Sequence, residues 1–128
     1  MVEEAEGDWH HVRVLDTRVQ QGAALELTED VRALLRRTAP TVAIRASEVD
    51  AALVSVESAT ALLHQMRRRI TDGSHRLMDA LDRMYRLEAR GDLDGARQEL
   101  RDVLALEVVP EYRDIAQGQL QRLCDLSD

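Results

Sequence analysis

The sequence contains no lysine, asparagine or phenylalanine, and it has a single cysteine and two prolines among its 128 residues. The lone cysteine, Cys124, excludes a disulfide within the chain, which is typical of a reducing compartment. No apolar run approaches the roughly 20 residues that span a bilayer, and the opening residues MVEEAEGDW have no basic or apolar region of a secretory signal. We therefore expect a soluble, cytoplasmic protein without a membrane partner.

Basic charge comes from arginine alone, since all 17 basic residues are arginines, while 24 acidic residues give a formal net charge of -7. The missing residue types have AT-rich codons, so a GC-rich genome accounts for this bias; selection for guanidinium groups is the alternative. An excess of carboxylates opposes binding to a polyphosphate, which weighs against a nucleic-acid partner. The same charge favours a cationic protein partner.

The N-terminal segment is acidic and then becomes amphipathic. Residues 1–7 are expected to form a flexible acidic tail. Asp8 is the expected N-cap of a first helix, because apolar residues follow it at helical spacing, and Gly22 is expected to end that helix. Trp9, the only tryptophan, is interpreted as a core anchor.

Two shorter helices are expected next. Thr28 is the predicted N-cap of one of them, and Pro40 ends or kinks it because proline lacks an amide proton. The stretch from Ser47 to Asp50 has the spacing of a capping box, so a short helix is predicted from there to about Val54.

A longer helix is predicted over about residues 58–90, with Ser58 as its N-cap and Gly91 just after its end. Within it, apolar residues occupy positions a and d of a heptad repeat for more than three heptads. These residues are Leu63, Met66, Ile70, Gly73, Leu77, Ala80, Met84 and Leu87. Gly73 either kinks the helix or lets a neighbouring helix pass closely.

Three further residues, Met78, Leu81 and Tyr85, widen the apolar face of this helix. A wide apolar face suits a globular bundle better than an isolated coiled coil.

The C-terminal part predicts two more helices. Asp92 is the expected N-cap of the first, and Pro110 lies in the first turn of the second, where proline is tolerated. Their expected inner faces are Ala96, Leu100, Val103, Leu104 and Leu106, and then Tyr112, Ile115, Ala116, Leu120 and Leu123. Gly91, Asp92, Ala96 and the later proline resemble one tetratricopeptide hairpin, but a solenoid needs about three repeats.

No segment alternates with a period of two over a convincing length, so the predicted fold class is all-α. We expect a compact bundle of five or six helices with one long helix and a C-terminal helical hairpin like that of tetratricopeptide repeats. The expected organisation is one domain over residues 8–123, followed by a short tail over residues 124–128.

Several stretches are similar to the DUSAM domain, a family of small paralogous bacterial proteins. They are DWHHV, LELTEDVRALLRRTA, SATALL, ALDRMYRLEARGDLDGAR and RDVLALEVVPEYRDIA, and they cover most of residues 8–118 in the same order. The resemblance implies a single helical domain, and it implies no catalytic residues because the family has no established activity.

The residues that metal binding and catalysis need do not occur in the required patterns. His10 and His11 are neighbours on a helix and point about 100° apart, while His64 and His75 are about three turns apart. The sequence has no GxSxG, Walker or GxGxxG motif. We therefore expect a protein that is not an enzyme and that uses no metal or cofactor.

Arginines recur every seven residues along one edge of the long helix. With Arg86 between the last two, the candidate partner-binding set is Arg69, Arg76, Arg83, Arg86 and Arg90, interleaved with Asp72 and Asp79. One hypothesis is a solvated row of ion pairs within the helix. The alternatives are that the C-terminal arginines dock acidic groups of a protein partner, since guanidinium binds carboxylate bidentately, or that they bind a phosphate-bearing ligand.

Three functions stay open at this point. The first is a non-enzymatic helical module for protein–protein interaction, including self-association as a homodimer, which the wide apolar face favours. The second is an immunity-type inhibitor of a basic toxin or nuclease, because opposite charge speeds association. The third is a regulator that binds an anionic ligand along the arginine edge.

Overall fold

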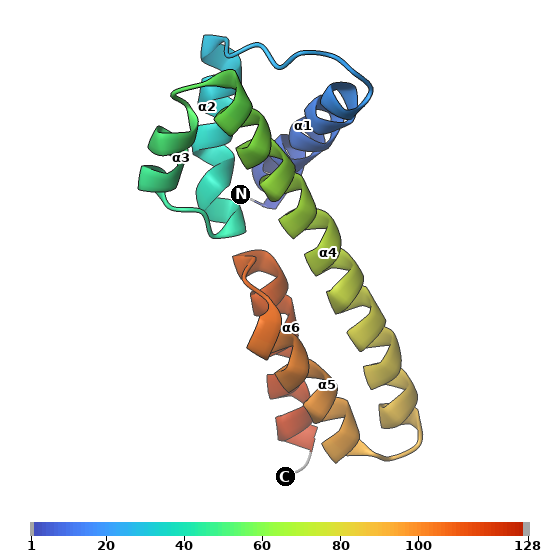
Figure 1. Cartoon of the computed structure of the whole chain (residues 1–128). Helices are drawn as coiled ribbons and strands as arrows, with labels where there is room; N and C mark the ends of the chain where they lie inside the picture. Colours follow the sequence, from blue (N-terminus) through green and yellow to red (C-terminus); the bar gives the residue numbers. More distant parts are fainter. Residues whose placement is uncertain (1, 127–128) are drawn as a thin grey trace. The chain divides into compact units, whose positions relative to one another are not determined.

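The computed structural model describes residues 2–126 of the chain and contains only helices in that range (Figure 1). The elements are α1 (Val2–Gln20), α2 (Glu29–Thr38), the 3-10 helix η1 (Ala39–Val42), α3 (Ala46–Ala52), α4 (Val56–Ala89), α5 (Leu93–Leu106) and α6 (Pro110–Leu126). The predicted all-α fold class is confirmed. Within the described range, no helix is both long and apolar enough to cross a membrane.

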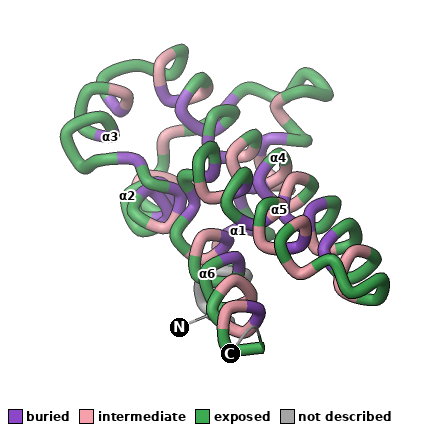
Figure 2. The backbone as a smooth tube through the Cα atoms, turned by 90° about the horizontal axis from the view of Figure 1, so that it is seen from below, coloured by how far each residue is buried: buried purple, intermediate pink, exposed green. Residues whose placement is uncertain are grey.

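The chain divides into two compact units, residues 1–70 and residues 71–128. Helix α4 contributes its first part to one unit and its second part to the other, and it is helical without interruption from Val56 to Ala89. In both units the buried positions lie along one side of each helix, and the exposed positions lie on the other (Figure 2).

In the first unit, α1 contributes Trp9 and Val12 to the core; their exposed fractions are 3% and 0%. The indole nitrogen of Trp9 donates to the hydroxyl of Thr41 at 2.9 Å, so the ring has both apolar burial and a polar partner. Trp9 is a core residue, as predicted. The expected N-cap at Asp8 is wrong, because α1 begins at Val2 and includes residues 2–7, which were expected as a tail.

The starts of α2 and α3 differ in how well their sequences predicted them. The hydroxyl of Thr28 accepts from the amide of Val31 at 3.2 Å, so the predicted N-cap of α2 is confirmed. The predicted capping box at Ser47 is wrong. Helix α3 begins at Ala46, after an N-cap Arg45 whose side chain makes no capping hydrogen bond.

Helix α4 begins two residues before the predicted N-cap Ser58. The hydroxyl of Ser55 accepts from the amide of Ser58 at 3.1 Å and so satisfies a donor of the first turn. All the predicted heptad positions are buried except Leu87, which is half-buried. Gly91, two residues after the end of α4, has a φ of 81°. This left-handed conformation favours glycine, which explains why a glycine follows the end of the helix.

In the second unit, α5 and α6 pack against each other, and ion pairs join both of them to residues 71–89 of α4. The carboxylate of Asp92 accepts from the amide of Gly95 at 2.8 Å, and α6 begins at Pro110, so both predicted helix starts are confirmed. Leu106 and Ile115 were expected inside, but they are 68% and 41% exposed. Helix α6 extends to Leu126, into the segment that was expected as a tail.

Candidate functional site

The arginine row, Arg69, Arg76, Arg83, Arg86 and Arg90, was predicted to pair along its own helix or to meet a partner. The structure gives these side chains different environments. The side chains of Arg69, Arg76 and Arg83 bond to other elements of their own unit, and Arg86 pairs within α4. The side chain of Arg90 makes no hydrogen bond or ion pair within residues 2–126.

Arg69 belongs to the first unit and caps the end of the 3-10 helix. Its Nη1 donates to the carbonyl oxygens of Val42 and Ala43, at 2.8 Å and 2.9 Å. Ala43 has a φ of 61°, a left-handed conformation that leaves these carbonyls pointing away from a regular helix. The guanidinium therefore satisfies acceptors that end a helix.

Arg76 pairs with a buried carboxylate that was not predicted from the sequence. Its Nη1 lies 2.7 Å from Oε1 of Glu107, whose exposed fraction is 3%. The other oxygen of Glu107 accepts from the amides of Val108 and Val109, at 3.1 Å and 2.9 Å. Glu107 therefore joins α4 to the turn between α5 and α6. Its only signal in the sequence is a carboxylate shortly before Pro110, near a helix start.

Arg83 and Arg86 form the other two ion pairs of the arginine row. Nε of Arg83 lies 2.6 Å from Oε1 of Glu99 on α5, and this hydrogen bond raises the pKa of Arg83 above its ordinary value. Arg86 pairs with Asp82 of its own helix at 3.0 Å, and both side chains are exposed. Arg86 alone in the row follows the predicted pattern of pairing within α4, and its partner is neither Asp72 nor Asp79.

A different polar contact ties α4 to α6. Arg122 binds Glu88 through two hydrogen bonds of 2.7 Å and 2.8 Å. The hydrogen bond from Arg122 lowers the pKa of Glu88 below its ordinary value. Paired in this way, the two side chains hold α6 against the last turn of α4.

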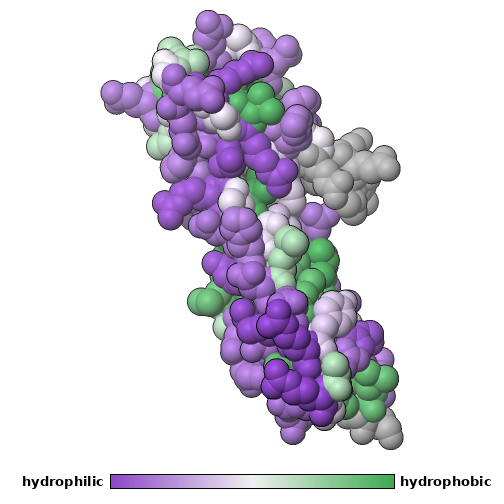
Figure 3. Space-filling view, turned by 90° about the vertical axis from the view of Figure 1, so that its right-hand side faces the viewer, coloured by the Kyte–Doolittle hydropathy of each residue, from purple (hydrophilic) through white to green (hydrophobic). Residues whose placement is uncertain are grey.

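Another part of the surface of α4 carries apolar side chains, which we call the apolar flank: Met78, Leu81 and Tyr85. Met78 and Tyr85 are 64% and 53% exposed, and Leu81 is half-buried. These residues were predicted to widen the apolar face of the helix, and Met78 and Tyr85 leave part of that wider face exposed to solvent. Figure 3 shows small hydrophobic patches of this kind on a largely hydrophilic surface.

The first unit also holds a polar cluster around Asp16, whose exposed fraction is 1%. The side-chain amide of Gln20 donates to this carboxylate at 2.8 Å. Side-chain nitrogens of His64 and Arg67 lie 3.5 Å and 3.7 Å from the carboxylate. Because these groups come from α1 and α4, the cluster anchors one helix on the other. Among the described residues, no three His, Cys, Asp or Glu side chains are arranged to hold a metal ion.

Comparison with known proteins places the chain in a family. The model of a family described as "Protein of unknown function (DUF2379)" matches residues 7–123. The chain belongs to this family. The match covers both units of the DUF2379 chain, including all five arginines of the row. No curated protein and no solved structure matches it.

Proposed function

We propose that this DUF2379 protein is a non-enzymatic helical module for protein–protein interaction, and that self-association is one form of that interaction. The observation that carries the proposal is the exposure of Met78 and Tyr85, which lie two turns apart on α4. A thioether and a phenol ring on one helix flank gain free energy when a partner covers them, at about 25 cal/mol for each Å² of apolar surface.

The arginine row supports the same choice of surface. Arg76 and Arg83 already bind Glu107 and Glu99, so a partner or anionic ligand would have to displace a carboxylate of this chain to reach them. The apolar flank needs no such exchange, because Met78 and Tyr85 are already exposed to solvent. Among the surfaces of α4, the apolar flank therefore offers the larger gain on binding.

The double variant Met78→Ser/Tyr85→Ser tests the proposal. Size-exclusion chromatography with light scattering at several hundred micromolar should give a mass above the monomer for the wild type and a monomer for the variant. Val54→Ser is the matched control, because Val54 is 81% exposed and lies in the other unit.

A monomeric wild type would refute self-association. The wider proposal would then depend on pull-downs from the native host. It would be rejected if the wild type and the double variant retained the same proteins.

A second proposal is that the partner is basic, as for an immunity-type inhibitor of a toxin or nuclease. Residues 71–128 contain 13 carboxylate side chains and 8 arginines, so this unit carries most of the net negative charge. Opposite charge would speed association, and the rate constant should fall steeply as salt is added. Lack of protection in co-expression with a basic toxin encoded next to the gene would count against this proposal.

We also propose that the DUSAM domain and the DUF2379 family are the same family. The stretches that resemble the DUSAM domain lie almost entirely within the matched residues 7–123, which supports treating the two families as one. A direct comparison of the two sequence profiles tests this, and profiles that do not align over the α4–α6 region would reject it.

A further inference from the structure

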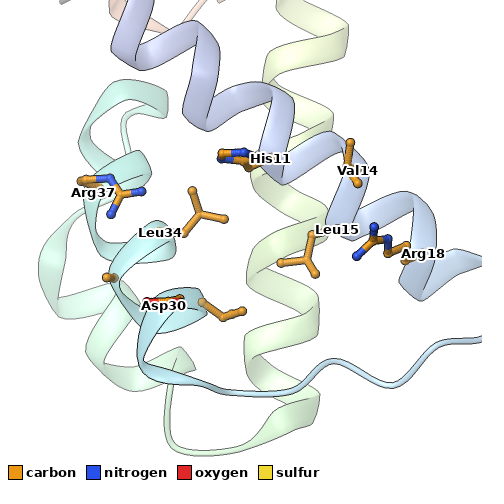
Figure 4. Close-up of a pocket in the computed structure, with 9 residues that line it drawn as sticks. His11, Val14, Leu15, Arg18, Asp30, Leu34 and Arg37 are labelled. Atoms are coloured by element: carbon orange, nitrogen blue, oxygen red, sulfur yellow. The ribbon is translucent and has the colours of Figure 1, made fainter.

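The first unit has an open groove between α1 and α2, shown in Figure 4. Its volume is about 450 Å³, which lies within the range of ligand-binding clefts. In Figure 4, His11 and Leu15 of α1 and Leu34 of α2 point into the space between the two helices. We call it the α1/α2 groove.

Each helix contributes a stripe two turns long to the groove. The stripe on α1 is His11, Val14, Leu15 and Arg18, and the stripe on α2 is Asp30, Val31, Leu34 and Arg37. In both stripes the middle residues are apolar and the end residues are polar. The groove therefore has an apolar floor about two helical turns long, or roughly 10 Å, with polar groups at its ends.

The two ends of the groove differ in how their charges are satisfied. At one end, Arg37 binds Asp8 through two hydrogen bonds of 3.1 Å and 3.0 Å, which ties the second turn of α1 to the end of α2. At the other end lie Arg18 on α1 and Asp30 on α2. Both side chains are exposed, and within residues 2–126 neither side chain makes a hydrogen bond or an ion pair.

We propose that the α1/α2 groove binds a short amphipathic helix of a protein partner that carries a carboxylate opposite Arg18 and a cation opposite Asp30. The proposal rests on the proposed function as an interaction module and names a surface and a partner chemistry for it. A helix laid between two helices buries apolar residues at spacings of three and four, which matches the stripes. A simple anion fits less well, because Asp30 balances the charge of Arg18.

The probes are two synthetic helical peptides of about 14 residues with the same leucine stripe. In one, a glutamate and an arginine flank one end of the stripe; in the other, these two residues are exchanged. The wild type should bind one peptide at least fivefold more tightly than the other, by fluorescence anisotropy. The charge-swapped protein Arg18→Glu/Asp30→Arg should prefer the other peptide.

Matched variants locate the binding. Arg18→Gln should weaken the preferred peptide severalfold, whereas Arg68→Gln, an exposed arginine of the same unit outside the groove, should not. Ala33→Trp fills the groove from an exposed position and should abolish binding while the circular dichroism spectrum is unchanged. NMR shifts on binding should map to the two stripes.

The proposal is overturned if neither peptide binds at millimolar concentration, or if Arg18→Gln and Arg68→Gln behave alike. It is also overturned if decanoate shifts the groove residues and the peptides do not, since the groove would then take a small amphiphile. The proposed function is tested separately, by the loss of a partner or a dimer in Met78→Ser/Tyr85→Ser. Failure of the groove proposal can therefore be distinguished from failure of the proposed function.

Discussion

At the scale of single residues, buried carboxylates organise both units. Asp16 and Glu107 are almost fully buried, and each pairs with groups on α4 that are distant in sequence: Glu107 accepts from Arg76, and Asp16 lies 3.5 Å and 3.7 Å from nitrogens of His64 and Arg67. A buried carboxylate is stable only when its oxygens are paired, so each of these residues fixes the elements that supply its donors. The surface ion pairs of the arginine row contribute less, because water screens them.

Glu107→Gln should therefore lower the free energy of unfolding by about 2 kcal/mol or more, because it leaves Arg76 and the amides of Val108 and Val109 without a charged acceptor. The same substitution at Glu99, whose partner Arg83 is 54% exposed, should cost about 0.5 kcal/mol or less. Urea denaturation of both variants measures the difference. Equal losses in the free energy of unfolding would show that the burial of Glu107 does not increase its contribution to stability.

The pair of Glu88 and Arg122 predicts a pH dependence with a definite sign. The pKa of Glu88 is lowered in the folded chain, mainly by the hydrogen bond from Arg122. Its stabilisation is therefore complete above the ordinary pKa of glutamate and is lost as the pH falls through the lowered value. The difference in unfolding free energy between the wild type and Glu88→Gln should be largest near pH 7 and should vanish in acid. A difference that grows in acid would contradict this.

At the scale of elements, α4 depends on a glycine where a neighbouring segment approaches. A Cβ at Gly73 would lie 2.6 Å from a ring carbon of Tyr112 and 2.8 Å from Oε1 of Glu107. Gly73 is therefore the point at which α6 and the α5–α6 turn come close to α4. Of the two roles predicted for this glycine, close approach is the one that the contacts support.

Gly73→Ala should destabilise the chain by about 1 kcal/mol or more, because overpacking outweighs the gain in helix propensity. Gly118→Ala is the matched control, since Gly118 lies within α6 and a Cβ there meets nothing within 4 Å. It should stabilise by about 0.5–1 kcal/mol. Thermal melts of the two variants should shift in opposite directions, and a stabilising Gly73→Ala would refute the close approach.

At the scale of the whole molecule, two compact units share one continuous helix. Because α4 carries core residues of both, unfolding of either unit exposes apolar positions of the same helix. We therefore predict one cooperative transition, consistent with the single domain expected from the sequence.

Trp9 offers a direct measurement, because it is the only tryptophan and lies in the first unit. Its fluorescence should follow the same urea curve as the helical circular dichroism signal of the entire chain. Separate midpoints would show that the two units unfold independently, as two domains.

The sequence by itself determined the helices, because their signals are local. Thr28, Asp92, Gly91 and Pro110 mark helix ends through their own hydrogen bonding and backbone preferences, and the heptad repeat of α4 identified its buried face. The starts of α1 and α3 were misplaced because the caps predicted for them, Asp8 and Ser47, are residue types that can also lie inside a helix.

Only the tertiary structure decided which side chains meet. Pairing with Asp72 and Asp79 was one hypothesis from the sequence, whereas Arg76 and Arg83 bind carboxylates on α5 and just after it. The sequence did not single out Glu107 as a buried residue, and it did not show which residues of the wide apolar face of α4 stay exposed, because burial depends on where the neighbouring helices lie. Helical spacing fixes the direction of a side chain from its own axis, and it contains no information on the element that occupies that direction.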